Sequence, residues 1–483
     1  MTSHLEEEYQ TSWLERQAFA ENMQPILGQL FRNKGVEITI YGRPLLNASP
    51  IDIIKAHKTV ALHEESKLRL RESFPFVEAL SKMTLAPSRI DIGKLAYRYL
   101  FQGQSNDLSI EQYLEKELST IANTKNEPRS QDVVLYGFGR IGRLLARLLI
   151  DQTGPAAELN LRAIVLRPSK GGDDLEKRAS LLRRDSVHGA FNGSITIDKE
   201  NNVIKANGAF IQVIYAKSPS EVDYTEYGIN NALVVDNTGI WSDEDGLGQH
   251  LQSKGVAKVL LTAPAKGDIK NIVYGVNQDM ILASDKIISA ASCTTNAITP
   301  VLKALNDKYG IRNGHVETIH SYTNDQNLID NYHPAPRRGR SAPLNMVIST
   351  TGAAKAVAKA LPELKGLLTG NAIRVPTPNV SMAIMNLNLK EATDKESLND
   401  YLRNISLKSD LQNQVDYTAS TEIVSTDLVG SRYAGVVDSQ ATIVDGDRAV
   451  LYVWYDNEFG YSCQVVRVMS EMAGITVPTL PVN

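Results

Sequence analysis

The sequence predicts an α/β protein with a mainly α-helical N-terminal region, a parallel sheet covered by helices, and an α+β region with an antiparallel sheet. Apolar residues between Leu14 and Phe31 recur at spacings of three and four, which indicates an amphipathic helix. From about residue 131 to Ser292, short continuous apolar runs alternate with helical patterns, as in a parallel sheet buried on both faces. Beyond Ser292 apolar and polar residues alternate, which favours an antiparallel sheet with one packed face.

The composition excludes several classes of protein. A chain of 483 residues predicts two to four folding units at roughly 100–200 residues each. Hydrophobic residues (42%) and charged residues (22%) have ordinary globular frequencies, and a net charge of −4 gives no reason to expect a nucleic-acid or membrane partner. The two cysteines cannot form a disulfide framework, no Cys/His cluster has metal-ligand spacing, and no apolar run reaches the length of a membrane helix. We therefore expect a cytoplasmic protein without a metal site.

The N-terminal region, residues 1–127, predicts mainly helices. After the first helix a short strand is expected at Val36–Tyr41, and Pro50 opens a helical stretch that continues to about Leu80. Shorter helical patterns follow at 91–101 and 109–121, and the polar segment 123–131 reads as a linker. A docking or regulatory module and a plain structural extension both fit this region.

A glycine-rich loop follows the linker. The apolar run from Val133 leads into Gly137, Gly139 and Gly142, a helical pattern comes next, and Leu161–Leu166 reads as a second buried strand. Glycines in this strand–loop–helix context permit a tight turn and a close approach of the backbone to a pyrophosphate. The spacing therefore predicts a Rossmann-type NAD(P)-binding domain over residues 128–292.

The position after the second strand bears on the choice of cofactor. An acidic residue that would hold the adenosine ribose hydroxyls is replaced by Leu166, and Arg167 follows it. Arg167 could accommodate a 2′-phosphate, which predicts that NADP is accepted, alone or beside NAD. The alternative is that Arg167 is only a solvated loop charge.

A cysteine and a histidine are the candidate catalytic pair. Cys293 lies in SAASCTTNA, after a predicted strand and before a helical pattern, where a helix N-terminus would favour the nucleophilic thiolate. A thiolate beside a nicotinamide cofactor suggests aldehyde oxidation through a hemithioacetal and a thioester. His320, in ETIHSYT, is the best candidate for the base among the 8 histidines.

Residues from about 131 to 475 closely resemble glyceraldehyde-3-phosphate dehydrogenase. The matching segments, in chain order, are GFGRIGR, DSVHG, DNTG, SAASCTTN, STTGAAKA, IRVPTPNVS and WYDNEFGYS. The resemblance implies a Rossmann domain over 128–292 completed by a C-terminal helix at 457–475, a catalytic domain over 293–456, and a homotetramer. It also implies that Cys293 is the nucleophile and His320 its activating base.

The resemblance further assigns binding residues. Substrate-phosphate residues correspond to Thr323, Asp325 and Arg374, and inorganic-phosphate residues to Ser292, Thr294, Thr351 and Gly352. Cofactor contacts correspond to Arg140, Ile141, Lys217, Thr262, Asn457 and Tyr461, in addition to the three loop glycines and Arg167. The basic cluster Arg337, Arg338 and Arg340 matches a loop that crosses to a neighbouring subunit in the family, although a solvated charge run is the alternative.

The sequence thus predicts the reversible phosphorylating oxidation of glyceraldehyde 3-phosphate to 1,3-bisphosphoglycerate with NAD or NADP, in glycolysis or gluconeogenesis. Two rival hypotheses remain. One is erythrose-4-phosphate dehydrogenase activity, in which water releases the acyl group, and the other is a non-catalytic regulatory or interaction protein on the same fold.

Overall fold

The computed structural model describes residues 2–64, 66–103, 107–122, 130–153, 159–168, 173–475 and 477–481, with side chains for these residues except 2–4, 62 and 63. These residues form two compact units. The N-terminal unit comprises the described residues up to 122 together with 477–481. The second unit comprises 130–153 and the described residues from 159 to 475.

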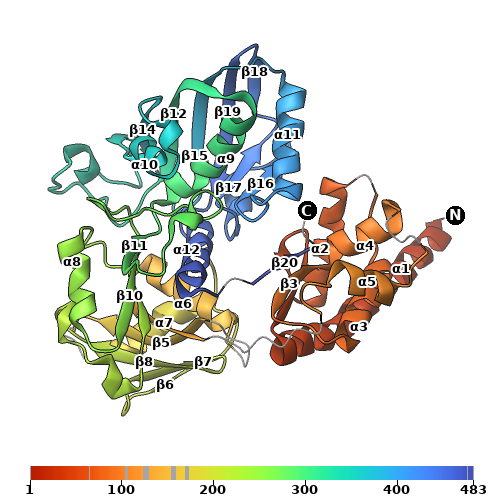
Figure 1. The fold of residues 1–483 in the computed structure, drawn as a ribbon, viewed down its shortest axis with the longest axis horizontal. Helices are drawn as coiled ribbons and strands as arrows, with labels where there is room; N and C mark the ends of the chain where they lie inside the picture. The colour runs from red at the N-terminus through yellow and green to blue at the C-terminus, as the bar shows by residue number, and fades with distance from the viewer. Residues whose placement is uncertain are drawn as a thin grey trace. The chain divides into compact units, whose positions relative to one another are not determined.

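The N-terminal unit is mainly helical, as the sequence predicts (Figure 1). Its helices are α1 (Thr2–Lys34), α2 (Pro50–His63), α3 (Leu70–Lys82), α4 (Ile92–Phe101) and α5 (Ile110–Glu117). A sheet of order β2–β1–β3–β20 is formed by β1 (Val36–Ile40), β2 (Arg43–Pro44), β3 (Ser88–Asp91) and β20 (Thr479–Leu480). Met23, Ile38, Phe76 and Tyr113 are almost completely buried and form part of its core.

Two features of this unit differ from the expectation. The helical stretch from Pro50 to Leu80 is two helices, because the backbone becomes extended at Glu64 and a new helix begins after Arg69, whose N–H donates to the Glu72 carboxylate (2.7 Å). The strand β3 was not expected, since four residues are too few to establish an alternating pattern.

The sheet of the N-terminal unit takes its edge strand from a distant part of the chain. Strand β20 pairs in parallel with β3, with Thr479 opposite Arg89 and Leu480 opposite Ile90. The Arg89 N–H also donates to the Pro478 carbonyl (2.9 Å). Residues that follow the second unit in sequence therefore complete a sheet whose other strands precede it.

The second unit contains the predicted parallel sheet, in the order β11–β10–β9–β4–β5–β8–β7–β6. Its strands are β4 (Gln131–Tyr136), β5 (Leu159–Leu166), β6 (Ile195–Asp198), β7 (Val203–Ala206), β8 (Ala209–Tyr215), β9 (Ala232–Asp236), β10 (Val256–Leu261) and β11 (Ile287–Ser289). The pairs from β11 to β8 are parallel, and β6–β8 form an antiparallel extension that was not predicted. The chain order reverses beside β4, where open α/β sheets bind ligands at the carboxyl ends of their strands.

Helices cover this sheet as expected for a doubly wound fold (Figure 1). They are α6 (Arg140–Asp151), α7 (Asp174–Arg183), α8 (Glu244–Gly248) and α12 (Phe459–Ala473). Leu145 of α6 and Val465 of α12 share a buried cluster with Leu135 and Ile164 of the sheet. The C-terminal helix therefore packs on the glycine-loop helix and belongs to this part of the core.

A second large sheet has the order β13–β14–β12–β15–β19–β17–β16, with β18 paired to β19. Its strands are β12 (Ile311–Ser321), β13 (Val347–Thr350), β14 (Leu368–Val375), β15 (Ser381–Leu389), β16 (Val415–Thr418), β17 (Gly435–Asp438), β18 (Ile443–Asp445) and β19 (Arg448–Tyr455). Most pairs are antiparallel, as predicted, but β12–β14 and β16–β17 are parallel. The helices of this part are α9 (Cys293–Tyr309), α10 (Ala353–Ala360) and α11 (Lys395–Lys408).

A buried histidine links two helices of the N-terminal unit. His57 Nδ1 lies 2.8 Å from the Ile53 carbonyl and must donate to it, which leaves Nε2 to accept from the Ser73 hydroxyl at 2.7 Å. Burial lowers the pKa of His57 to about 4, so the ring is neutral at pH 7.

We predict that the N-terminal unit loses stability in mild acid. Because the pKa of His57 is lower in the folded state, its contribution is complete above pH 6.5 and declines as the pH falls towards 4, by at most about 3 kcal/mol. Hydrogen exchange of the β1 and β3 amides at several pH values measures this loss. A His57→Leu variant should show a flatter pH dependence, and an unchanged slope would contradict the assignment.

Candidate active site

The glycine loop fits a dinucleotide pyrophosphate. Gly137 has a left-handed backbone (φ 92°), and an added Cβ at Gly142 would lie 2.4 Å from the Gly137 carbonyl oxygen. Nothing lies within 4 Å of the Cβ position of Gly139, the N-cap of α6. The backbone bonding of α6 begins with the Arg143 N–H donating to the Gly139 carbonyl (3.0 Å), so the preceding N–H groups of Arg140, Ile141 and Gly142 have no intrahelical acceptor.

Two exposed cations follow neighbouring strands at this edge of the sheet. Arg167 follows β5 and Lys217 follows β8, and the two strands are in parallel register at Leu166 and Tyr215. Leu166 is almost completely buried, so no carboxylate occupies the end of β5. Thr262, at the end of β10, donates its hydroxyl to the Asp236 carbonyl (3.0 Å), which ties β10 to β9 beside the glycine loop.

Cys293 is the first residue of α9, and it is partly exposed. The preceding Ser292 is the N-cap, and its hydroxyl oxygen accepts from the Thr295 N–H at 3.0 Å. Ala291 has a left-handed backbone (φ 56°), and its carbonyl accepts from the Tyr461 hydroxyl at 2.8 Å. The chain is thus bent and held immediately before the thiol.

His320 faces the thiol from the end of β12. Its Nε2 atom lies 3.6 Å from Cys293 Sγ, and its Nδ1 atom lies 2.7 Å from the Ser321 carbonyl. Arg374 Nη1, which can only donate, also lies 2.9 Å from Nδ1. The shorter contact is to a carbonyl that can only accept, so we assign the proton to Nδ1, and the lone pair of Nε2 is then directed at the sulfur. Burial, and to a smaller degree the positive charge of Arg374, lowers the pKa of His320 to about 3.

Arg374 completes a group of three. It lies on β14 in register with His320, and its Nη1 atom donates to the Ser321 carbonyl at 3.1 Å. The Nε atom of Arg374 is buried without a hydrogen-bond partner among the described residues, so this donor is available to an anion. Burial raises the pKa of the Cys293 thiol, and the Arg374 charge opposes that rise.

The other residues matched to phosphate sites differ in whether their polar groups already have a hydrogen-bond partner. The Ser292 and Thr294 hydroxyls have internal partners, Thr295 Oγ1 at 2.7 Å and the Tyr455 hydroxyl at 2.9 Å. Thr323 follows β12 and its hydroxyl has no partner among the described residues, whereas Asp325 pairs with Arg338. Thr351 and Gly352 precede α10, and no hydrogen bond links them to Cys293, His320 or Arg374 in the described part of the chain.

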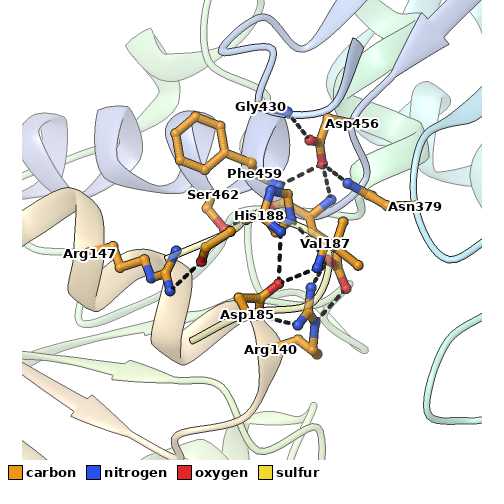
Figure 2. A network of polar contacts seen from close by, with 12 residues as sticks. Arg140, Arg147, Asp185, Val187, His188, Asn379, Gly430, Asp456, Phe459 and Ser462 are labelled. Carbon is orange, nitrogen blue, oxygen red and sulfur yellow. Dashed lines mark hydrogen bonds and ion pairs between the residues drawn. The ribbon is translucent and has the colours of Figure 1, made fainter. Parts of the chain in front are cut away.

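Asn457 lies in the turn between β19 and α12, and a network of polar contacts holds this turn (Figure 2). The buried carboxylate of Asp456 accepts from the N–H groups of Gly430, Glu458 and Phe459 and from the Asn379 amide, at 2.8–2.9 Å. With four donors on one carboxylate, the turn has little freedom.

The same network reaches the glycine loop. The Arg140 guanidinium pairs with Glu458 and with Asp185, and His188 Nε2 lies 3.0 Å from the Glu458 carboxylate (Figure 2). Although burial opposes it, the N–H groups of His188 and Val187 and the Arg140 charge lower the pKa of Asp185 to about 2. The Arg140 guanidinium is therefore bonded to carboxylates of the protein. A ligand could still bind the backbone N–H of Arg140, which lies in the first turn of α6.

Three neighbours of the site were missed in the sequence. Ser381 donates to Asn457, the Tyr455 hydroxyl bonds Thr294 and Thr318, and Arg338 lowers the pKa values of His320 and Arg374. A serine at the start of a strand and a tyrosine within one carry no signal, because strand partners are set by tertiary register. Arg338, which belongs to the basic cluster matched to a subunit-crossing loop in the family, bonds Asp325 and Ser349 of its own chain.

Among the described residues, no group of three or more His, Cys, Asp or Glu side chains is placed to bind a metal ion. None of the helices in the described part of the chain is long and apolar enough to cross a membrane.

Comparison with known proteins identifies two domains. Residues 131–244 match the family model described as "Glyceraldehyde 3-phosphate dehydrogenase, NAD binding domain". Residues 292–457 match the model for the C-terminal domain of the same enzyme. The Zymomonas mobilis glyceraldehyde-3-phosphate dehydrogenase is 39% identical over 71% of this chain and 98% of its own length. A chloroplastic enzyme of Arabidopsis thaliana is 41% identical over 71% of this chain and 83% of its own length.

Another relative also covers the N-terminal region. A "glyceraldehyde-3-phosphate dehydrogenase-like protein" of Pseudomonas aeruginosa is 61% identical over 464 residues, which is 95% of this chain and 100% of the relative. This length exceeds the dehydrogenase region, so the similarity extends into the N-terminal unit.

We predict that Gly142→Ala destabilises the glycine loop. Its Cβ would lie 2.4 Å from a backbone oxygen that cannot move without shifting the loop, and the expected loss is about 1–3 kcal/mol in the free energy of unfolding. Chemical denaturation measures it. Gly248→Ala is the matched control, because Gly248 is helical (φ −61°) with nothing within 4 Å of its Cβ position. Equal stability of the two variants would contradict the close packing.

Proposed function

Since the chain belongs to the glyceraldehyde-3-phosphate dehydrogenase family, we propose that it oxidises glyceraldehyde 3-phosphate to 1,3-bisphosphoglycerate in the presence of inorganic phosphate, with NAD or NADP. The observation that carries this proposal is the group formed by Cys293, His320 and Arg374, with Sγ and Nε2 at 3.6 Å. The group provides a nucleophile, a base and a cation in one partly exposed site.

The first step is attack of the thiol on the aldehyde. Cys293 and His320 are both neutral at pH 7, because burial raises the pKa of the thiol and lowers that of the imidazole. The thiol proton passes to His320 Nε2 as sulfur adds to the carbonyl carbon, and His320 then delivers it to the carbonyl oxygen to give a hemithioacetal. The Cys293 N–H, at the start of α9, would stabilise the transient negative charge on that oxygen.

Oxidation and phosphorolysis complete the cycle. A bound nicotinamide cofactor supplies the hydride acceptor. His320 takes the hydroxyl proton of the hemithioacetal as the hydride leaves, so that Cys293 holds a thioester. Phosphate then attacks the thioester carbon, sulfur departs as the thiolate, and His320 returns a proton to it.

Substrate phosphate would bind Arg374 and Thr323. Among the described residues, Arg374 Nε and the Thr323 hydroxyl have no hydrogen-bond partner, which supports this assignment. Inorganic phosphate would bind near Thr351 and Gly352 and the start of α9. Because the Ser292 and Thr294 hydroxyls already have internal partners, the second phosphate site is the weaker one, which keeps phosphate-independent erythrose-4-phosphate oxidation as a second candidate.

The ends of β5 and β8 support the use of NADP. Arg167 and Lys217 are both exposed there, and Leu166 presents no charge to repel a 2′-phosphate. The remaining cofactor contacts would come from the loop N–H groups, Thr262, Asn457 and Tyr461.

A homotetramer is proposed from the family and from an exposed apolar surface. Leu328, Tyr332, Leu344 and Met346 are 73–87% exposed on one loop, and so large an apolar area is typical of an interface. Neither cysteine forms a disulfide in the described residues, which suits a reducing compartment, and we propose cytoplasmic glycolysis or gluconeogenesis as the setting. The N-terminal unit would then be a non-catalytic addition, structural or regulatory.

We predict that His320→Asn lowers kcat/KM for glyceraldehyde 3-phosphate by roughly 10²–10⁴, because the thiol loses its proton acceptor. NAD(P)H absorbance measures turnover, with and without phosphate. His315→Asn is the control, since His315 lies on the same strand but is half-exposed and bonds Thr369. Full turnover of the native enzyme without phosphate would favour the erythrose-4-phosphate activity, and a Cys293→Ser variant that retains its cellular role would favour a non-catalytic protein.

We predict that Leu166→Asp shifts cofactor preference towards NAD. A carboxylate at the end of β5 would repel a 2′-phosphate and accept from ribose hydroxyls, which should lower the NADP/NAD ratio of kcat/KM by at least roughly tenfold. Leu166→Asn separates charge from polarity and should change the ratio little. If the native enzyme already prefers NAD strongly, the NADP assignment is wrong.

A further inference from the structure

A single buried hydroxyl lies between the catalytic base and the residue proposed to meet the nicotinamide. Ser381 begins β15 and is 1% exposed. Its Oγ atom accepts from the Ser321 N–H at 3.1 Å, and its hydroxyl donates to Asn457 Oδ1 at 2.8 Å. The carbonyl of the same Ser321 accepts from His320 Nδ1. Ser381 thus connects the strand end that holds the base with the turn that carries Asn457.

The direction of these bonds fixes the Asn457 amide. Ser381 Oγ accepts from a backbone N–H and can also accept from the Tyr455 hydroxyl, so its own proton goes to Oδ1 of Asn457 at 2.8 Å. The Nδ2 atom then points away from Ser381. It has no hydrogen-bond partner among the described residues, and solvent can reach it. A donor of known orientation is therefore open to a ligand.

The backbone before Ser381 is in an unusual conformation. Val380 is buried and has φ 63°, a left-handed value that β-branched residues rarely adopt. Its carbonyl accepts from the Ser321 hydroxyl at 3.0 Å. Since such conformations persist only where the surroundings impose them, the fold holds this segment in the position that directs Ser381 at Asn457.

We propose that Ser381 is a positioning residue that orients the Asn457 amide, so that Nδ2 donates to the carboxamide oxygen of the nicotinamide. This inference rests on the proposed function, because it requires a nicotinamide cofactor in the site. Ser381 does not touch the cofactor or substrate. It sets the angle of the nicotinamide ring relative to Cys293 by removing the alternative amide orientation.

The test compares ligands that differ only in the nicotinamide. Isothermal titration calorimetry of the full chain would measure NAD against ADP-ribose and NADP against 2′-phospho-ADP-ribose. In Ser381→Ala the freed amide can rotate, so affinity for the intact cofactor should fall by roughly tenfold while affinity for the matching ADP-ribose compound stays within twofold. Ser381→Thr, which retains the hydroxyl, should restore most of the lost affinity for the intact cofactor.

Ser439→Ala is the matched control. Ser439 is a buried serine in the same sheet region whose hydroxyl donates to the Thr418 carbonyl at 2.8 Å, so its loss removes a comparable hydrogen bond away from Asn457. It should leave the ratio of the two affinities unchanged. Thermal unfolding of each variant would establish that it is folded.

A second readout follows the hydride. With a deuterated aldehyde, the native enzyme should label one face of the nicotinamide, and Ser381→Ala should label both faces detectably. If Ser381→Ala lost equal affinity for the cofactor and for the matching ADP-ribose compound, or lost affinity for neither, the positioning role would be overturned. Turnover of the native enzyme with glyceraldehyde 3-phosphate is measured in parallel: inactivity there would refute the proposed function, while the binding ratios would still decide the role of Ser381.

Discussion

The ion pair between Arg140 and Glu458 is the contact on which the geometry of the second unit depends. It joins the first residue of the glycine-loop helix to the N-cap of α12, and Asp185 and His188 complete the group. Two carboxylates gathered around one partly buried guanidinium are stabilising only when all partners are in place, because removing one leaves an unpaired charge. The glycine loop, the Asp185–His188 turn and the turn with Asn457 therefore have to form together. In the proposed function, the residues for the pyrophosphate and those for the nicotinamide would be held by the same network.

Low polarity governs the chemistry of the site. Burial raises the pKa of Cys293, lowers that of His320 and lowers that of Arg374, so each shift favours the uncharged form. A neutral thiol is less readily oxidised than a thiolate, and Ala297, one turn further along α9, offers no second sulfur for a disulfide. The uncharged thiol and imidazole thus limit oxidation of the site when no ligand is bound.

Much of this arrangement was predictable where local pattern and chemistry coincide. The glycine spacing, the buried parallel strands and the setting of Cys293 follow from short segments, and the structure has a Rossmann sheet and a helix N-terminus at those places. Partners set by register were not predictable. Ser381 meets Asn457 because β15 lies beside β19, the short strand β3 has too few residues for a pattern, and β20 pairs across almost the whole chain. Arg338 shows the same limit, since its bond to Asp325 depends on how one loop folds back on itself.

The pairing of β20 with β3 has a consequence for protein synthesis. During translation the N-terminal unit leaves the ribosome first, yet its sheet keeps an open edge at β3 until residues 479–480 emerge. An open edge is a template for strands of other chains. The nascent chain must therefore carry this exposed edge while the entire dehydrogenase region is being made, and chaperones that mask strand edges are the natural protection during that interval.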